Sequence, residues 1–144
     1  MGFKDSYVPV FNAIRDTLSN LDCLQQIILG KSLKQIGNLN NLPVAIINTD
    51  LAKVVPSDGV SGYQVQIPIV LDVIIIEYEA PEWFEKMNTV MSEIVDALIV
   101  NPTLEGKLQD LVWTSYAPGT ISLQDCTFYG GEIRFMAILD YSAS

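Results

Sequence analysis

The clearest pattern in the chain is NPTLEGKLQDLVWTSYAPGTISLQDCTFYGGEIRFMAILDY, residues Asn101–Tyr141. It predicts the end of a helix, a short turn, and strands that close the protein with a hairpin. Tyr129-Gly130-Gly131-Glu132 predicts the hairpin turn, because paired glycines adopt positive φ freely. The last strand then alternates apolar and polar side chains from Ile133 to Tyr141. The segment contains no catalytic motif, so its pattern is typical of a scaffold.

The sequence predicts further strands before the Gly-Gly pair. Leu111–Tyr116 and Thr120–Phe128 are predicted strands, separated by a turn at Pro118-Gly119. Leu42–Asn48 is a short apolar, β-branched strand. The longest strand signal is Tyr63–Glu79, where apolar residues recur at period two on one face. These residues are Val65, Ile67, Ile69, Leu71, Val73 and Ile75.

Two amphipathic helices are predicted. The first is capped by Ser6, carries Pro9 in its first turn and ends at Gly30. The second starts at Pro81 and ends at Asn101-Pro102. Its buried stripe contains Trp83, Met87, Val90, Ile94 and Leu98, widened by Phe84, Met91 and Val95. The order of elements predicts a single α+β domain over residues 1–144, with a mainly antiparallel sheet packed against two principal helices.

Two polar stretches are predicted as loops. Residues 31–41 are rich in Asn and Gly. Residues 50–62 contain Pro56, Asp58, Gly59, Ser61 and Gly62, which are typical of an exposed, mobile loop. A loop of this length in a small domain is either functional or disordered.

The charge is unevenly distributed along the sequence. The chain has 144 residues, 49% of them apolar, and a net charge of −9. Up to Leu71 there are five Lys/Arg and five Asp/Glu, whereas from Asp72 onward there are three against twelve. This acidic half argues against binding to phosphates, because nucleic-acid binders concentrate basic residues on one face. It favours either simple solubility or a surface that repels nucleic acid, such as the wall of a DNA passage.

The sequence gives no sign of export or of membrane insertion. No secretory signal is apparent, and the most apolar stretch, Ile67–Ile76, is far shorter than the roughly twenty residues of a spanning helix. We therefore expect a soluble protein made in the cytoplasm. Cys23 and Cys126 are expected to be free thiols, because two cysteines without a CxxC spacing make no disulfide framework.

The chain contains no histidine, which excludes Ser-His-Asp and Cys-His catalysis and the common zinc sites. Glu77 and Glu79 share a strand face and could serve acid–base chemistry, although a solvated strand end explains them better. Asp72, inside an apolar run, could be a perturbed catalytic acid or a residue on the wet face of the sheet. Trp83 and Trp113 fit core or interface packing better than ligand binding. We predict no enzymatic activity, no cofactor and no metal site.

With these residues in place, the chain resembles the phage tail terminators, small head–tail joining proteins that cap a tail tube. The resemblance rests on an N-terminal helix, a long apolar strand ending Glu77-Tyr78-Glu79, and a helix closed by Asn101-Pro102. A leucine-bearing turn over Leu104–Leu111 and a Gly-Gly hairpin follow, and the last strand ends Leu139-Asp140-Tyr141. The resemblance implies a ring, usually hexameric, that stops tube polymerisation and provides a docking surface for the head. Related caps close contractile injection systems that have no head.

The resemblance also implies partners and a location. The partners would be further copies of the chain, the tail tube and possibly its sheath, and a head or neck connector, with DNA only passing through the lumen and no membrane contact. The location would be the head-proximal end of the virion tail, assembled in the host cytoplasm. We expect an acidic luminal surface at Glu82, Glu85 and Glu93, and tube contacts at Lys53, Val55, Asp58 and Val60. The alternatives are another tail adaptor or tube component, a small-molecule binding module, and an enzyme that uses carboxylates, Tyr or Lys.

Overall fold

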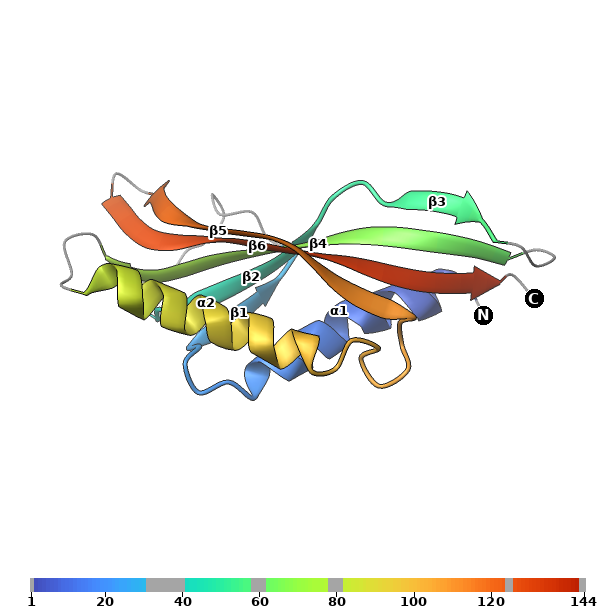
Figure 1. Cartoon of the computed structure of the whole chain (residues 1–144), viewed down its shortest axis with the longest axis horizontal. Coiled ribbons are helices and arrows are strands. Elements are labelled where there is room, and N and C mark those ends of the chain that lie inside the picture. The colour runs from blue at the N-terminus through green and yellow to red at the C-terminus, as the bar shows by residue number, and fades with distance from the viewer. Residues whose placement is uncertain (1, 31–40, 58–61, 78–81, 124–125, 143–144) are drawn as a thin grey trace.

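The computed structural model describes residues 2–30, 41–57, 62–77, 82–123 and 126–142. Along the chain its elements are α1 (Lys4–Ser19), β1 (Gln26–Leu29), β2 (Val44–Thr49), β3 (Lys53–Pro56), β4 (Gly62–Glu77), α2 (Trp83–Ile99), β5 (Asp110–Leu123) and β6 (Cys126–Ser142). The six strands form one sheet, and both helices lie on the same side of it (Figure 1). The predicted α+β domain with two principal helices and a mainly antiparallel sheet is confirmed.

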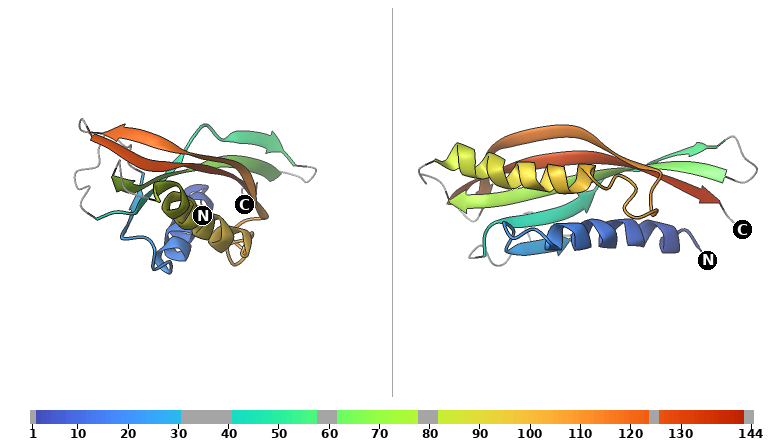
Figure 2. Two further views of the ribbon diagram at one scale, coloured as in Figure 1. Left: turned by 60° about the vertical axis from the view of Figure 1, so that its left-hand side comes forward. Right: turned by 60° about the horizontal axis from the view of Figure 1, so that its bottom comes forward.

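The sheet is built around its two longest strands. The order across it is β1-β2-β4-β6-β5, and β3 pairs with β4 as well. One edge of β4 is shared, because β3 pairs with Tyr63–Gln66 and β2 pairs with Ile69–Ile74. The β1–β2 pair is parallel and the other described pairs are antiparallel. Both views in Figure 2 show the helices on one side of this curved sheet and the opposite side free of helices.

The predicted alternation along β4 is confirmed. The six residues predicted to share a face are all buried against the helices, and Ile67, Ile69, Leu71 and Val73 have no exposed surface. They meet the inward residues of β6, among them Ile133 and Phe135. The opposite face of the sheet, which we call the outer face, has its own small apolar cluster. That cluster contains Val44, Ile46, Ile74 and Phe128.

The first predicted helix is partly wrong. It starts at Lys4 rather than after a Ser6 cap, so Pro9 lies inside the helix rather than in its first turn. It ends at Ser19 rather than at Gly30, and residues 26–29 form the strand β1. Ile28 was assigned to the apolar stripe of this helix, but parallel pairing of residues 26–29 with β2 satisfies their backbone groups and determines the structure.

The second predicted helix is confirmed over the residues that the structure describes; Pro81 lies outside them. Met87, Val90, Met91, Ile94, Val95 and Leu98 are buried, as the apolar stripe predicts. Phe84 was expected to widen this stripe, but its side chain is 58% exposed. The helix is preceded by Glu82 in the left-handed conformation (φ 59°). Glu82 was predicted to lie in the first turn of the helix, but it redirects the chain just before the helix begins.

The C-terminal strands differ from the prediction in their turns. β5 is continuous from Asp110 to Leu123 and runs through the predicted turn at Pro118-Gly119. Gly130 and Gly131 lie inside β6 and pair with Ile74 and Val73 of β4. They make no hairpin turn. The hairpin closes after the pair Leu123–Cys126, and residues 124–125 lie outside the described residues.

The two glycines are explained by close backbone approach. A Cβ atom on Gly130 would lie 1.9 Å from the carbonyl oxygen of Val73, and one on Gly131 would lie 2.4 Å from that of Ala117. Neither glycine has a positive φ, since the positive-φ glycines of the described chain are Gly30 and Gly106. Glycine is therefore required at both positions because a side chain would clash with the neighbouring backbone, and not because a turn is formed there.

The predicted loop over residues 50–62 is also partly wrong. Residues 53–56 form β3, which pairs with β4, and Gly62 is already part of β4. Residues 58–61 lie outside the described residues. β3 and β4 together make a hairpin arm at the end of the molecule where α1 begins and β6 ends (Figure 1).

Candidate functional site

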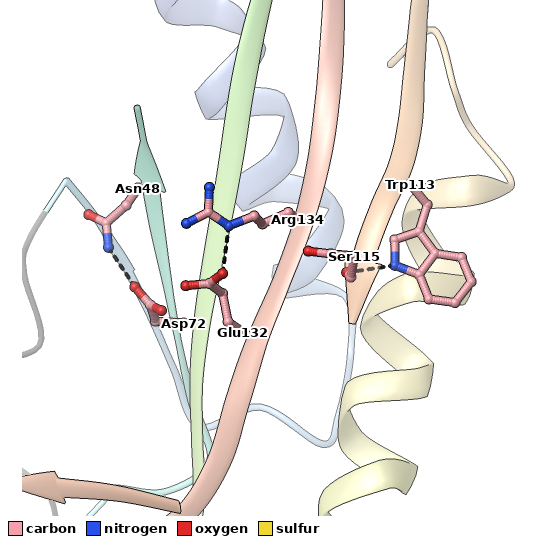
Figure 3. Close-up of polar contacts among 6 residues, drawn as sticks. All are labelled: Asn48, Asp72, Trp113, Ser115, Glu132 and Arg134. Atoms are coloured by element: carbon pink, nitrogen blue, oxygen red, sulfur yellow. Dashed lines mark hydrogen bonds and ion pairs between the residues drawn. The ribbon is translucent and has the colours of Figure 1, made fainter. Parts of the chain in front are cut away.

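The most polar arrangement in the sheet lies on the outer face, across β2, β4 and β6 (Figure 3). The Nδ2 group of Asn48 donates a hydrogen bond to Oδ2 of Asp72 at 3.1 Å. Asp72 pairs directly with Glu132 in the β4–β6 register, and Nε of Arg134 donates to Oε1 of Glu132 at 2.5 Å. Two carboxylates thus face each other across a strand pair, and each has its own polar partner.

Burial raises the pKa of Asp72, and the neighbouring charge of Glu132 acts in the same direction. The hydrogen bond from Asn48 and the charge of Arg134 oppose this shift. The arrangement places Asp72 on the wet side of the sheet, as one of the two interpretations of this residue expected. Arg134 already binds Glu132, so in the pair of carboxylates Asp72 is the one that takes up a proton more readily than an isolated aspartate.

The other predicted carboxylate pair cannot be placed as a pair. Glu77 is the last residue of β4, and Glu79 lies outside the described residues. Within the described residues, no group of three or more His, Cys, Asp or Glu side chains is arranged to hold a metal ion. Among those same residues, no helix is long and apolar enough to cross a membrane.

The three residues predicted as an acidic luminal surface lie along α2 and are all exposed. Glu82 immediately precedes the helix, whereas Glu85 and Glu93 lie on its solvent side. A shallow surface joins Glu85 and Glu93 to Asp96, which the sequence reasoning did not include. The spacing of three residues between Glu93 and Asp96 could have identified it, since residues three apart are neighbours on a helix.

Glu93 also approaches the segment that follows α1. Burial, followed by a hydrogen bond with Glu93, raises the pKa of the Cys23 thiol to about 12. Cys23 is free, as predicted. A thiol with such a pKa is a poor nucleophile, so this cysteine contributes packing rather than chemistry.

Two of the four predicted tube-contact residues lie on β3. Lys53 pairs with Gln66 and is exposed, while Val55 pairs with Gln64 and is half-buried. Asp58 and Val60 lie outside the described residues. Two exposed apolar side chains that the prediction omitted lie here, Leu51 (88% exposed) just before β3 and Val54 (57%) on β3.

The two tryptophans have different surroundings. Trp83 stacks on Tyr129 with the ring centroids 4.1 Å apart and packs against the core. Trp113 lies at the sheet edge, 47% exposed, with its indole Nε1 donating to the Ser115 carbonyl at 3.0 Å (Figure 3). Trp113 and Tyr116 line a groove of about 280 Å³ between β5 and α2, together with Ile99.

A second groove lies beside α1. It is lined largely by apolar side chains from α1, β1 and β2, including Tyr7, Val8, Phe11, Leu29 and Ile47, and has a volume of about 410 Å³. Its polar lining comes from Asn48 and Thr49. The groove could accept a small apolar molecule or an apolar side chain from another protein.

Comparison with known proteins adds no family to this description. Neither the scan against protein-family models nor the search of curated proteins matched this chain.

Proposed function

We propose that the chain is a structural assembly protein that caps the tube of a phage tail or related injection system as a ring, most simply of six copies. In this proposal the ring ends tube polymerisation and offers a docking surface to the head or neck. It would lie at the head-proximal end of the tail after assembly in the host cytoplasm. DNA would pass through the lumen without sequence-specific contacts.

The observation that carries the proposal is the position of the exposed apolar side chains. Both edges of the sheet carry some of them: Val54 lies on β3 at one edge, with Leu51 just before it in the chain, and Val112 and Trp113 lie on β5 at the other. The remaining exposed large apolar side chains lie on or next to the helices, at Phe3, Val8, Phe84, Ile99 and Val100, and on β4 at Tyr63. A monomer that binds a small ligand has no need of apolar side chains at both edges, whereas a ring subunit presents two different surfaces to its two neighbours.

The acidic surface of α2 supports the same proposal. Glu82, Glu85 and Glu93 are exposed on the helix layer, and a negative wall keeps DNA from adhering as it slides. The outer face of the sheet points the opposite way and also carries carboxylates, at Asp72, Glu132 and Asp140. In a ring, either the α2 surface or the outer face of the sheet faces the lumen. Substitutions on each surface in turn distinguish these two orientations of the subunit.

The first experiment is negative-stain electron microscopy of the purified chain, alone and mixed with tail tubes. Rings, or a cap at one end of each tube, are the expected result. Monomers that ignore the tubes would refute the proposal. A second experiment reverses Glu82, Glu85 and Glu93 to Lys, with Asp72, Glu132 and Asp140 to Lys as the matched set on the outer face. Hindered DNA delivery with intact rings identifies the luminal surface.

The groove beside α1 favours a second candidate, a small-molecule binding module. Its apolar lining and volume of about 410 Å³ suit a small ligand. This candidate expects a monomer whose melting temperature rises with ligand concentration. Screening apolar compounds by thermal shift tests it, with Val8→Asp as the variant that should abolish any shift.

A further inference from the structure

One row of residues crosses the sheet from a positive to a negative charge. Lys53 on β3 pairs with Gln66 on β4, Gln66 pairs with Ile138 on β6, and Ile138 pairs with Asp110 on β5. Because paired residues share a face of the sheet, all four side chains lie on the outer face. The cation therefore lies at one edge of the sheet and the anion at the opposite edge, at the same level.

Lys53 and Asp110 cannot neutralise each other within one copy. Three interstrand steps of about 4.8 Å separate them, which is about 14 Å and beyond the screening length at physiological salt. Both residues are exposed. The ion pairs found among the described residues are Arg15–Asp16 and Glu132–Arg134. Oδ1 of Asp110 accepts a hydrogen bond from the Leu111 N–H at 2.8 Å, but among the described residues neither Lys53 nor Asp110 forms an ion pair. Each end of the row therefore presents a charge without an opposite charge beside a sheet edge.

The two edges also match in length. Beyond Trp113 the edge of β5 is unsuited to pairing, because the register shifts between Trp113 and Ser115, the indole caps the Ser115 carbonyl, and Pro118 lacks an N–H. The regular part of that edge is Asp110–Trp113. It has the same length as β3, which comprises four residues.

At Val54 the edge of β3 is oriented to accept another strand, whereas Pro56, the next outward-facing residue, has no N–H to donate. Ser57 N donates to the Gly62 carbonyl at 3.0 Å, so the alternation of an antiparallel ladder turns the N–H and C=O of Val54 away from β4. The Val54 side chain is on the helix side of the sheet and is 57% exposed. On β5, Trp113 is exposed on the same side of the sheet beside the α2 groove. Apolar surface is thus available on the same layer at both edges.

We propose that the occupant of the β5 edge is a second copy of this chain, whose β3 adds antiparallel to residues 110–113. The direction is already correct, since three successive antiparallel pairings make β3 antiparallel to β5. An antiparallel register that keeps the faces matched and stays within residues 110–113 places Lys53 of one copy opposite Val112 of the next, Val54 opposite Leu111 and Val55 opposite Asp110. Lys53 then lies diagonal to Asp110 on the outer face, and Val54 lies beside Leu111 on the helix side.

This contact joins different surfaces of identical chains, so it is head-to-tail, and such contacts close into rings when the rotation per copy allows it. The inference rests on the proposed ring but specifies which strands hold it together. The acidic half of the chain is consistent with this choice, because a symmetric contact between two α2 surfaces would bring like charges together, whereas the edge contact brings Lys53 to Asp110.

Charge reversal tests the pairing. We expect Lys53→Asp or Asp110→Lys to raise the dissociation constant of the assembly by about fivefold or more, since repulsion replaces attraction at every contact. The double variant should restore assembly. Lys86→Asp, an exposed lysine on α2, is the matched control and should assemble as the unmodified chain does. Assembly is measured by sedimentation velocity at fixed ionic strength, with a thermal melt to show that each variant folds.

Cysteine cross-linking tests the same contact without relying on charge. In a chain with Cys23 and Cys126 changed to Ser, Lys53→Cys combined with Val112→Cys should give a ladder of covalent multimers under mild oxidation. Paired residues on adjacent strands lie within disulfide range. Lys86→Cys with Val112→Cys should give none. Rings that form without cross-links and without charge rescue would overturn this contact and leave the ring proposal intact, whereas a chain that never assembles would overturn both.

Discussion

Gly130 and Gly119 occupy paired positions on β6 and β5, yet a methyl group should have opposite effects at the two sites. A Cβ on Gly130 meets the Val73 carbonyl oxygen at 1.9 Å, whereas a Cβ on Gly119 meets nothing within 4 Å. Real Cβ contacts are not shorter than 3.0 Å, so β4 and β6 would have to separate by about 1 Å at this pair. Backbone atoms of two central strands cannot give way as a flexible side chain would.

We therefore expect Gly130→Ala to lower the free energy of unfolding by about 3 kcal/mol or more, the upper range for inserting atoms into a packed interior. For a chain of this size that corresponds to a fall in melting temperature of about 10 °C. Gly119→Ala should change the stability by less than about 1 kcal/mol, and any change should favour folding, because alanine restricts the unfolded chain.

The assay is urea denaturation followed by far-UV circular dichroism, with midpoints and slopes compared for the two variants. Similar midpoints for Gly130→Ala and Gly119→Ala would refute the argument from close backbone approach. A large loss in Gly119→Ala alone would instead support the turn that the sequence pattern predicts at Pro118-Gly119.

Other expectations concern single side chains. Trp83→Ala should destabilise the fold by about 3 kcal/mol through loss of the stack on Tyr129, and its neighbour Phe84→Ala by less than about 1 kcal/mol, both by urea denaturation. Burial raises the pKa of Asp72 in the folded protein, so the native state binds a proton more tightly than the unfolded chain. The free energy of unfolding should therefore fall as the pH rises from 3.8 towards the pKa of the folded state. Asp72→Asn should remove this pH dependence in thermal melts taken across that range. Cys23, with a pKa of about 12, should be alkylated by iodoacetamide far more slowly than an ordinary thiol at pH 8; in a Cys126→Ser background, Glu93→Gln should speed the reaction, and an unchanged rate would show that Glu93 does not suppress the thiolate.

The sequence predicted best where one periodicity operates along a whole element. The period of two in β4 identified six residues that are buried on its helix side, because β2, β3 and β6 all pair with this strand antiparallel and the helices cover a single face. The stripe of α2 was identified for the same reason. Phe84 was misplaced because it lies at the start of the helix, where the apolar surface that the rest of the stripe packs against is already occupied by Trp83 and Tyr129.

Prediction failed where one residue type serves two purposes. A Gly-Gly pair fits a tight turn and a close approach of neighbouring strands equally well. At Gly130-Gly131 only the positions of the Val73 and Ala117 backbones decide between these two structures. Ile28 fits the apolar stripe of the first helix until β2 is known to lie beside it. In the candidate site, the approach of Asp72 to Glu132 depends on the β4–β6 register, and the row from Lys53 to Asp110 depends on three such registers; no pattern in the sequence specifies these combinations.

The place of β6 in the sheet has a consequence for synthesis of the chain. β6 is made after the other strands of this sheet, yet it lies between β4 and β5 and covers nearly the whole length of β4. β4 ends at Glu77 and β6 ends at Ser142, 65 residues later. At typical translation rates the apolar edge of β4 stays unpaired for about 3 to 13 s. In chains that stop before β6, the edge of β4 has no partner strand and can pair with other chains. Truncation before β6 should therefore yield aggregates in the cell rather than a smaller folded protein.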